Sequence, residues 1–316
     1  MHLNLVHLHL LLNHFPTIGT IIGLGLLLLA MAKNSEDLTR ASFAVFFAIA
    51  LVSFPAYMTG YPAQSALKGL PGVAPAIIDT HQSAALLALV FMEITGVVAL
   101  FGLWRARRPS PRARGYTPAV LLLAIVTVAQ MASAANVGGE IRHPEILSGD
   151  QAAATAGIIA PQMLTSASIT RFQFRYPWAW PALEVLHFAG LCLLFGIVLI
   201  GNLRILGLMK NAPYIDVHKV LPWGMLGFAI NAVTGMMFFI GQAFQYMDNP
   251  AFHLKVVFML LAGANVLYLT LFDEVWTLGP GVDAPMTAKL VAASQVFLWI
   301  GVIYFGRMLP YLGDAF

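Results

Sequence analysis

Residues 190–201 read GLCLLFGIVLIG, a run that contains no charged side chain. The run lies in a longer apolar segment, 182–208, and a transmembrane helix needs about 20 predominantly apolar residues. Lipid offers no hydrogen-bond partner to backbone N–H and C=O groups, so a lone apolar segment crosses a bilayer as a helix. The segment therefore predicts a membrane-spanning helix.

Seven other segments have the same character, and breaks rich in Pro, Gly and charged residues separate them. The composition agrees, because only 10% of residues are charged and 59% are hydrophobic, whereas a soluble domain has about 25% charged residues. The fold class expected is an all-α integral membrane protein with about eight transmembrane helices. The expected spans are 10–32, 41–60, 80–104, 117–137, 182–208, 221–245, 253–273 and 288–310.

The longest stretch between spans, 138–181, divides the chain into two four-helix bundles. We expect a first membrane half over 1–137, an extracytoplasmic crossover segment over 138–181 and a second membrane half over 182–316. Within the crossover, Gln151–Met163 is small and apolar enough for a short interfacial helix. The crossover is interpreted as a simple connection, with docking of a partner or gating of a substrate as alternatives.

The positive charges predict the orientation in the membrane. Loops after the odd-numbered spans carry 11 of the 17 Lys and Arg residues, and cytoplasmic loops are enriched in these residues. Both termini are therefore expected outside. Lys33 and Arg40 follow the first span and no Lys or Arg precedes it, the reverse of a signal peptide, so this span is expected to be retained. Arg204, at the inner end of the fifth span, is expected to extend toward the headgroups.

Four histidines recur at matching positions near the outer ends of the first, third, fifth and seventh spans. A low-spin b-type haem needs two imidazoles that face each other across the porphyrin, and helices of a bundle supply them. We expect two haems, one in each half. The single cysteine, Cys192, leaves no CxxCH motif and excludes covalently attached haem. The expected iron ligands are His14 with His81 and His187 with His253.

Other polar residues suit the surroundings of a haem. Glu184 lies three residues before His187 on the same helical face and is expected to accept its second ring N–H. The haem propionates require cations or amides, for which Arg171, Arg175, Lys255 and Arg307 are the candidate cations.

Each of these histidines also has a plainer interpretation as an interfacial residue with a polar tip. His2, His7 and His9 precede the first span and suggest a copper site at the outer surface or, more simply, interfacial residues. His143 belongs to a polar turn or to a metal site.

Glu93, near the middle of the third span, is interpreted in two ways. It is either a proton-relay group or a carboxyl paired with a polar neighbour such as Gln130 or Asn231.

Two sets of motifs resemble known families. The first half contains His14-Phe15-Pro16, Gly60, Asp79-Thr80-His81 and Gly138-Gly139-Glu140-Ile141-Arg142-His143. This set resembles an uncharacterised bacterial four-helix membrane family.

The second half contains Pro181-Ala182-Leu183-Glu184-Val185-Leu186-His187, Asn202-Leu203-Arg204 and Asn249-Pro250-Ala251-Phe252-His253. It resembles a second such family, which is distantly similar to copper-resistance protein D and to b-type membrane cytochromes. That family's arginine motif reads Asp-Leu-Arg, and Asn202 replaces the acid here. The resemblance implies a fusion of two four-helix units, multi-pass in the bacterial inner (cytoplasmic) membrane.

The leading hypothesis is a di-haem b-type electron-transfer subunit in the lipid bilayer, and any enzyme would be an oxidoreductase. It would link the quinol pool to an extracytoplasmic dehydrogenase or cytochrome. One alternative is a copper-handling or small-solute transporter. Another is a non-catalytic assembly subunit that docks a partner through 138–181. The net charge of +3 gives no indication of nucleic-acid binding.

Overall fold

Eight helices long and apolar enough to cross a membrane are found in the computed structural model, as the sequence predicts. The structure describes residues 4–68, 70, 73, 75–106, 113–142, 165–272 and 275–312, and these residues contain no β-strand. The fold is therefore that of an all-α integral membrane protein. The spans are Leu5–Lys33, Glu36–Leu67, Pro75–Ala106, Thr117–Ile141, Ala179–Leu206, Tyr214–Gly241, Pro250–Phe272 and Met286–Tyr311.

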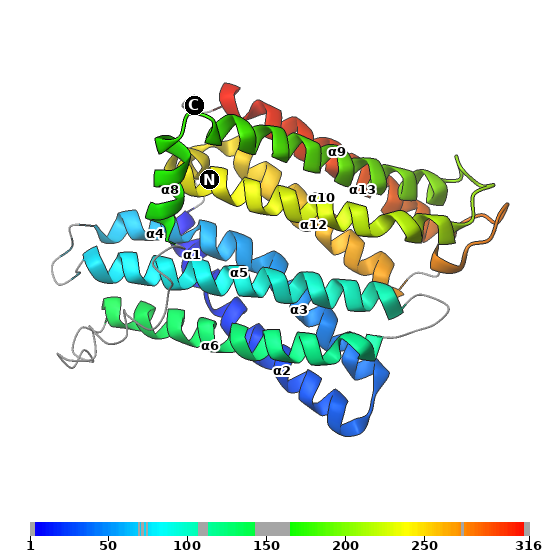
Figure 1. Ribbon diagram of the computed structural model, residues 1–316, viewed down its shortest axis with the longest axis horizontal. Helices are drawn as coiled ribbons and strands as arrows, with labels where there is room; N and C mark the ends of the chain where they lie inside the picture. The colour runs from blue at the N-terminus through cyan, green and yellow to red at the C-terminus, as the bar shows by residue number, and fades with distance from the viewer. Residues whose placement is uncertain are drawn as a thin grey trace. The chain divides into compact units, whose positions relative to one another are not determined.

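The helices extend beyond the predicted spans at most ends, because hydropathy marks only the hydrocarbon-facing part of each helix. The first two spans each contain a break, at Asn13 and at Thr59, and so comprise two helices each. The α-helices are α1 (Leu5–Leu12), α2 (His14–Lys33), α3 (Glu36–Met58), α4 (Gly60–Leu67), α5 (Pro75–Ala106), α6 (Thr117–Arg142), α8 (Ser166–Arg175), α9 (Ala179–Leu206), α10 (Tyr214–Gly241), α11 (Ala243–Asp248), α12 (Pro250–Phe272) and α13 (Met286–Met308) (Figure 1).

The chain forms two compact units, Met1–Ser168 and Ile169–Phe316, and each holds four of the spans. The predicted first half ended at residue 137, but α6 continues to Arg142. The division between the units falls inside α8, within the predicted crossover. The predicted interfacial segment 151–163 lies outside the described residues.

In the first unit, α2, α3, α5 and α6 close a four-helix ring, since α2 packs on α3 and α6, and α5 packs on α3 and α6 (Figure 1). The short helix α1 packs on α3 and α4. Small residues allow the close approach, as is common between membrane helices. A Cβ on Gly96 would collide with the Cβ of Ala50, so α3 and α5 approach each other closely there.

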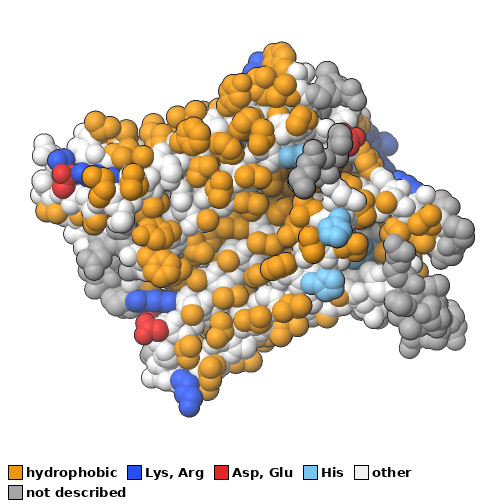
Figure 2. Space-filling model, turned by 180° about the vertical axis from the view of Figure 1, so that it is seen from behind, with side chains coloured by type: hydrophobic (Ala, Val, Ile, Leu, Met, Phe, Trp, Pro, Cys, Tyr) orange, Lys and Arg blue, Asp and Glu red, His pale blue; other side chains and the backbone are white. Residues whose placement is uncertain are grey.

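Hydrophobic side chains cover most of the face seen in Figure 2, where a few histidines interrupt them. In water this surface would be an aggregation liability, because monomeric soluble proteins rarely expose large apolar patches. Leu122 and Phe297, for example, are 66% and 65% exposed although each lies within a membrane span. Such side chains face lipid.

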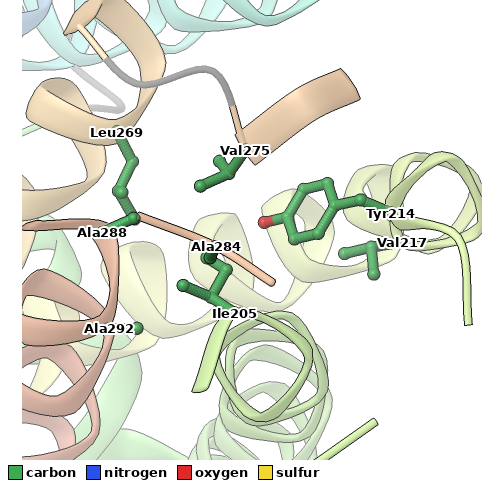
Figure 3. Packing of buried hydrophobic residues seen from close by; sticks show 8 residues of the cluster. All are labelled: Ile205, Tyr214, Val217, Leu269, Val275, Ala284, Ala288 and Ala292. Atoms are coloured by element: carbon green, nitrogen blue, oxygen red, sulfur yellow. The ribbon is translucent and has the colours of Figure 1, made fainter. Parts of the chain in front are cut away.

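In the second unit, α9 packs on α10 and α13, and α12 packs on α13. One end of this unit has a compact apolar cluster, shown in Figure 3. It joins the end of α9, the start of α10 and the start of α13. Its buried members are Ile205, Tyr214, Val217, Leu269, Val275, Ala284, Ala288 and Ala292.

Arg204 lies at the same end of α9 and has no exposed surface, so its expected extension toward the headgroups is wrong. Its guanidinium donates to the carbonyl of Ala212, and Nη2 donates to those of Gly279 at 2.7 Å and Val282 at 3.1 Å. The five N–H groups of an arginine fork suit several fixed acceptors. Arg204 thus fastens both loops at this end of the unit to α9.

Asn249 has a similar structural role at the opposite end of the second unit. Its Oδ1 accepts from the Ala251 N–H at 2.9 Å and caps α12, while its Nδ2 donates to the Leu309 carbonyl at 2.8 Å. Asn249 and Arg204 both belong to the sequence motifs of this half. The structure thus gives a packing reason for both.

Asp283 accepts hydrogen bonds from Lys210 at 2.9 Å and from Lys289 at 3.0 Å, in the loop before α13. These hydrogen bonds hold the pKa of the Asp283 carboxyl below its ordinary value of 3.8. A carboxyl whose pKa is lowered by folding stabilises the folded state above its ordinary pKa and loses that effect as pH falls through the lowered value.

We therefore expect Asp283→Asn to lower thermal stability slightly near pH 7, because the site is exposed. The difference from wild type should shrink as pH falls through the lowered pKa of Asp283 and vanish where both chains carry a neutral group. Melting temperatures in detergent across this range would check it. A difference that persists in acid would mean that Asp283 acts through something other than its charge.

Candidate functional site

His9 and His81 lie at one end of the first unit, which we call the histidine end of that unit. His9 is on α1, and its Nδ1 lies 3.0 Å from the Ala56 carbonyl oxygen and 3.3 Å from the Thr59 hydroxyl. Ala56 is in the last turn of α3, where carbonyl groups lose their intrahelical partners. A carbonyl only accepts hydrogen bonds, so Nδ1 of His9 carries the proton.

His81 is on α5, and its Nδ1 lies 3.0 Å from the carbonyl oxygen of Ala134 on α6. The same argument places the proton on Nδ1. Gly138, one turn after Ala134, makes room for the ring, because a Cβ there would lie 3.0 Å from Cε1 of His81. Gly60 of α4 lies beside His9, where a Cβ would be in ordinary van der Waals contact with Cε1 of His9, at 3.5 Å. Each imidazole therefore lies against a glycine of a neighbouring helix.

The proton on Nδ1 leaves the Nε2 lone pair of each ring free. Neither Nε2 has a hydrogen-bond partner among the residues that the structure describes. Iron-binding and zinc-binding histidines typically have this arrangement, in which one ring nitrogen donates to a carbonyl and the other binds the metal. His9 contacts the last turn of α3, and His81 lies near the start of α5, which packs on α3.

His14, the expected partner of His81, is exposed at the first residue of α2, and no contact of its ring with another described residue is found. His9 and His14 are five residues apart, which is about 140° around a helix, so the two rings face different directions. The apolar residues on all sides of this span gave no signal of which histidine faces inward. The structure therefore assigns the inward position to His9.

We expect Gly138→Val to displace His81, since even a Cβ at residue 138 would press on the ring. Gly139→Val is the matched control, because a Cβ at Gly139 would meet nothing within 4 Å. Any ligand bound at His81 should be weakened at least tenfold by the first substitution and unaffected by the second. Equal effects of the two would show that His81 does not depend on the space at Gly138.

In the second unit, Nδ1 of His187 on α9 lies 2.8 Å from the hydroxyl oxygen of Thr234 on α10. The Thr234 hydroxyl donates its hydrogen to the Ile230 carbonyl at 2.7 Å, so it accepts from His187. His187 therefore also carries its proton on Nδ1 and has a free Nε2. Glu184, the expected acceptor, instead accepts from Nε1 of Trp180 at 3.2 Å.

His253 differs from the other three. Its Nε2 lies 2.8 Å from the Met247 carbonyl oxygen and donates to it, so this nitrogen is not free to bind iron. In the expected pair, His187 therefore has a free Nε2, whereas the Nε2 of His253 is occupied by a hydrogen bond. The Met247 carbonyl is presented by the short helix α11, which the sequence did not predict.

The expected partners of the haem propionates lie in two places in the second unit. Arg171 and Arg175 are exposed on α8. Lys255 lies inside the helices, where its Nζ would be 3.4 Å from a Cβ on Gly306 of α13. Its charge acts on the His187 ring.

Tyr246, on α11, adds a neutral polar group at this end of the unit. Burial raises the pKa of its phenol to about 12, and the charge of Glu184 adds to this shift.

Glu93 on α5 has a buried Oε1 with no hydrogen-bond partner among the described residues. The expected pairing with Gln130 or Asn231 is not found, and Asn231 donates instead to the Gly227 carbonyl at 3.1 Å. The proton-relay interpretation stays a prediction.

The remaining histidines do not build a metal site in the described part of the chain. His7 is exposed, and His2 and His143 lie outside the described residues. Within the described ranges, no group of three or more His, Cys, Asp and Glu side chains is placed to hold a metal ion. A copper centre with three such ligands is therefore not formed there.

No family model, curated protein or solved structure matches this chain.

Proposed function

We propose that the protein is a b-type haem-binding electron-transfer subunit, with the haem iron held by His9 and His81. The observation that carries the proposal is the pair of free Nε2 atoms at the histidine end of the first unit, each with its proton fixed on Nδ1 by a carbonyl. A bis-histidine haem b accepts and gives single electrons.

The residues fit a flat, largely apolar group. The two imidazoles come from different helices, α1 and α5, and both stand against glycines. Both rings are held at Nδ1, which fixes their orientation and raises the basicity of Nε2. The proposal replaces His14 with His9 and keeps His81.

The proposed role is to pass electrons between the quinol pool and a redox partner at the membrane surface. Both histidines lie at one end of the unit, so a single haem here serves transfer at one side of the membrane. The Lys and Arg distribution favours the extracytoplasmic side of a bacterial inner membrane. A dehydrogenase or cytochrome outside the cytoplasm is the partner of matching chemistry.

Haem content tests the proposal. The full chain, expressed with sufficient haem and purified in detergent, should contain one haem b per chain. His253→Ala should not change that value, because Nε2 of His253 donates to Met247. No haem, or stoichiometric copper in its place, would overturn the proposal. Two haems per chain, one of them lost in His253→Ala, would restore the di-haem hypothesis.

A further inference from the structure

His187 is the histidine with a free Nε2 that the proposed haem does not use. Thr234 and Ile230 fix its proton on Nδ1, so Nε2 acts only as an acceptor. Among the described residues, no donor reaches this nitrogen. A site of this kind accepts a hydrogen bond from a ligand hydroxyl.

Lys255 supplies the complementary group. Its ammonium has neither a hydrogen-bond acceptor nor a carboxylate in the described part of the chain, although it lies against Gly306 inside the helices. A lysine without a partner in a membrane span is costly, and such residues mark functional sites by default. Lys255 lies one turn after Phe252 on α12, the Phe252 ring stacks on Phe239 of α10, and the adjacent Phe238 contacts the His187 ring. One acceptor and one donor are therefore available to the same ligand.

Aromatic side chains surround the His187 ring on one side, and lipid-facing side chains flank it along α9. Phe238 lies edge-on to the His187 ring, with 5.6 Å between the ring centroids. Trp180 packs on Phe238, with 4.9 Å between their ring centroids. The neighbours of His187 on α9 are lipid-facing, with Leu186 50% exposed and Phe188 59% exposed. A ligand can thus approach His187 from the bilayer itself.

We propose that His187 and Lys255 bind the headgroup of a hydroxylated aromatic lipid of the quinol class. A quinol hydroxyl donates to Nε2 of His187, and an oxygen of the same ring accepts from Lys255. The aromatic side chains suit a flat ring, and the lipid-facing flanks suit its tail. The inference rests on the proposed function in that the bound quinol is the electron donor for the haem, but binding itself needs no haem.

Calorimetric titration of the detergent-solubilised full chain with a decyl-substituted benzoquinol tests the site, after subtraction of the heat of partitioning into empty micelles. His187→Gln and Lys255→Met should each weaken binding at least tenfold. His253→Gln, at the same end of the unit but with its Nε2 donating to Met247, is the matched control and should bind as wild type does. Elution as a single species in size exclusion shows that each variant is folded.

The outcomes separate the two proposals. Binding of the quinol by a chain without haem, lost in His187→Gln, would support the site and overturn the proposed function. A haem-loaded chain that binds equally well with or without His187 would overturn the site and leave the haem proposal standing. Equal or tighter binding of dodecanoic acid, lost in the same variants, would assign the site to a fatty acid instead and overturn the quinol proposal.

Discussion

His9→Ala should abolish low-spin haem binding in the first unit, whereas His14→Ala should leave it intact. His9 offers a free Nε2 near His81, while His14 is exposed on α2. His81→Ala should have the same effect as His9→Ala. Haem content and the absorbance of the reduced protein, measured on all three variants after purification in detergent, would check this.

The paired variants make this result specific. His9 and His14 both lie in the span Leu5–Lys33, so a general loss of membrane insertion would affect the two alanine variants alike. Loss of haem in His14→Ala, with haem retained in His9→Ala, would restore the pairing expected from the sequence.

The second large effect is expected at Arg204. Arg204→Ala should destabilise the second unit by about 3–5 kcal/mol, because the carbonyls of Ala212, Gly279 and Val282 lose their hydrogen bonds to the guanidinium and a cavity opens. Arg204→Lys should recover only part of this loss, since a single ammonium does not reproduce the planar fork. Thermal unfolding in detergent would measure both.

Arg307→Ala is the matched control, because Arg307 is an exposed arginine in the same unit. It should change the free energy of unfolding by less than about 0.5 kcal/mol. Similar losses at Arg204 and Arg307 would contradict the role of Arg204 in fastening the two loops.

The spans could be predicted from the sequence because the requirement for some 20 apolar residues is a property of composition along the chain. The run at 190–201 lies in the middle of α9, as expected. The short helices α1, α4 and α11 were not predicted, since each has only six to eight residues and adjoins a span or overlaps its end. Their boundaries depend on local breaks in the helix, such as the one at Thr59 between α3 and α4.

The site was predicted only in part. Its residue type and its approximate place on the first and third spans came from the sequence, and His81 occupies the place expected. The choice between His9 and His14 depends on helix phase, which an all-round apolar helix does not reveal. The roles of Thr234 for His187 and of the Met247 carbonyl for His253 depend on contacts between helices, which no local pattern encodes.

The burial of Arg204 also could not be predicted from the sequence. An arginine at the inner end of a span reads as one that extends toward the headgroups. It is buried instead because the loops at 212 and 279–282 fold back over it and supply carbonyls. Loop conformation of this kind depends on tertiary structure.

The central claim is that His9 and His81 together hold one haem b. The electron paramagnetic resonance spectrum of the oxidised, purified full chain tests it most directly, because the signal reports the axial ligands of ferric iron. We expect a low-spin signal of bis-imidazole type that is lost in both His9→Ala and His81→Ala. A high-spin signal, a copper signal or no metal signal in the wild-type chain would contradict it.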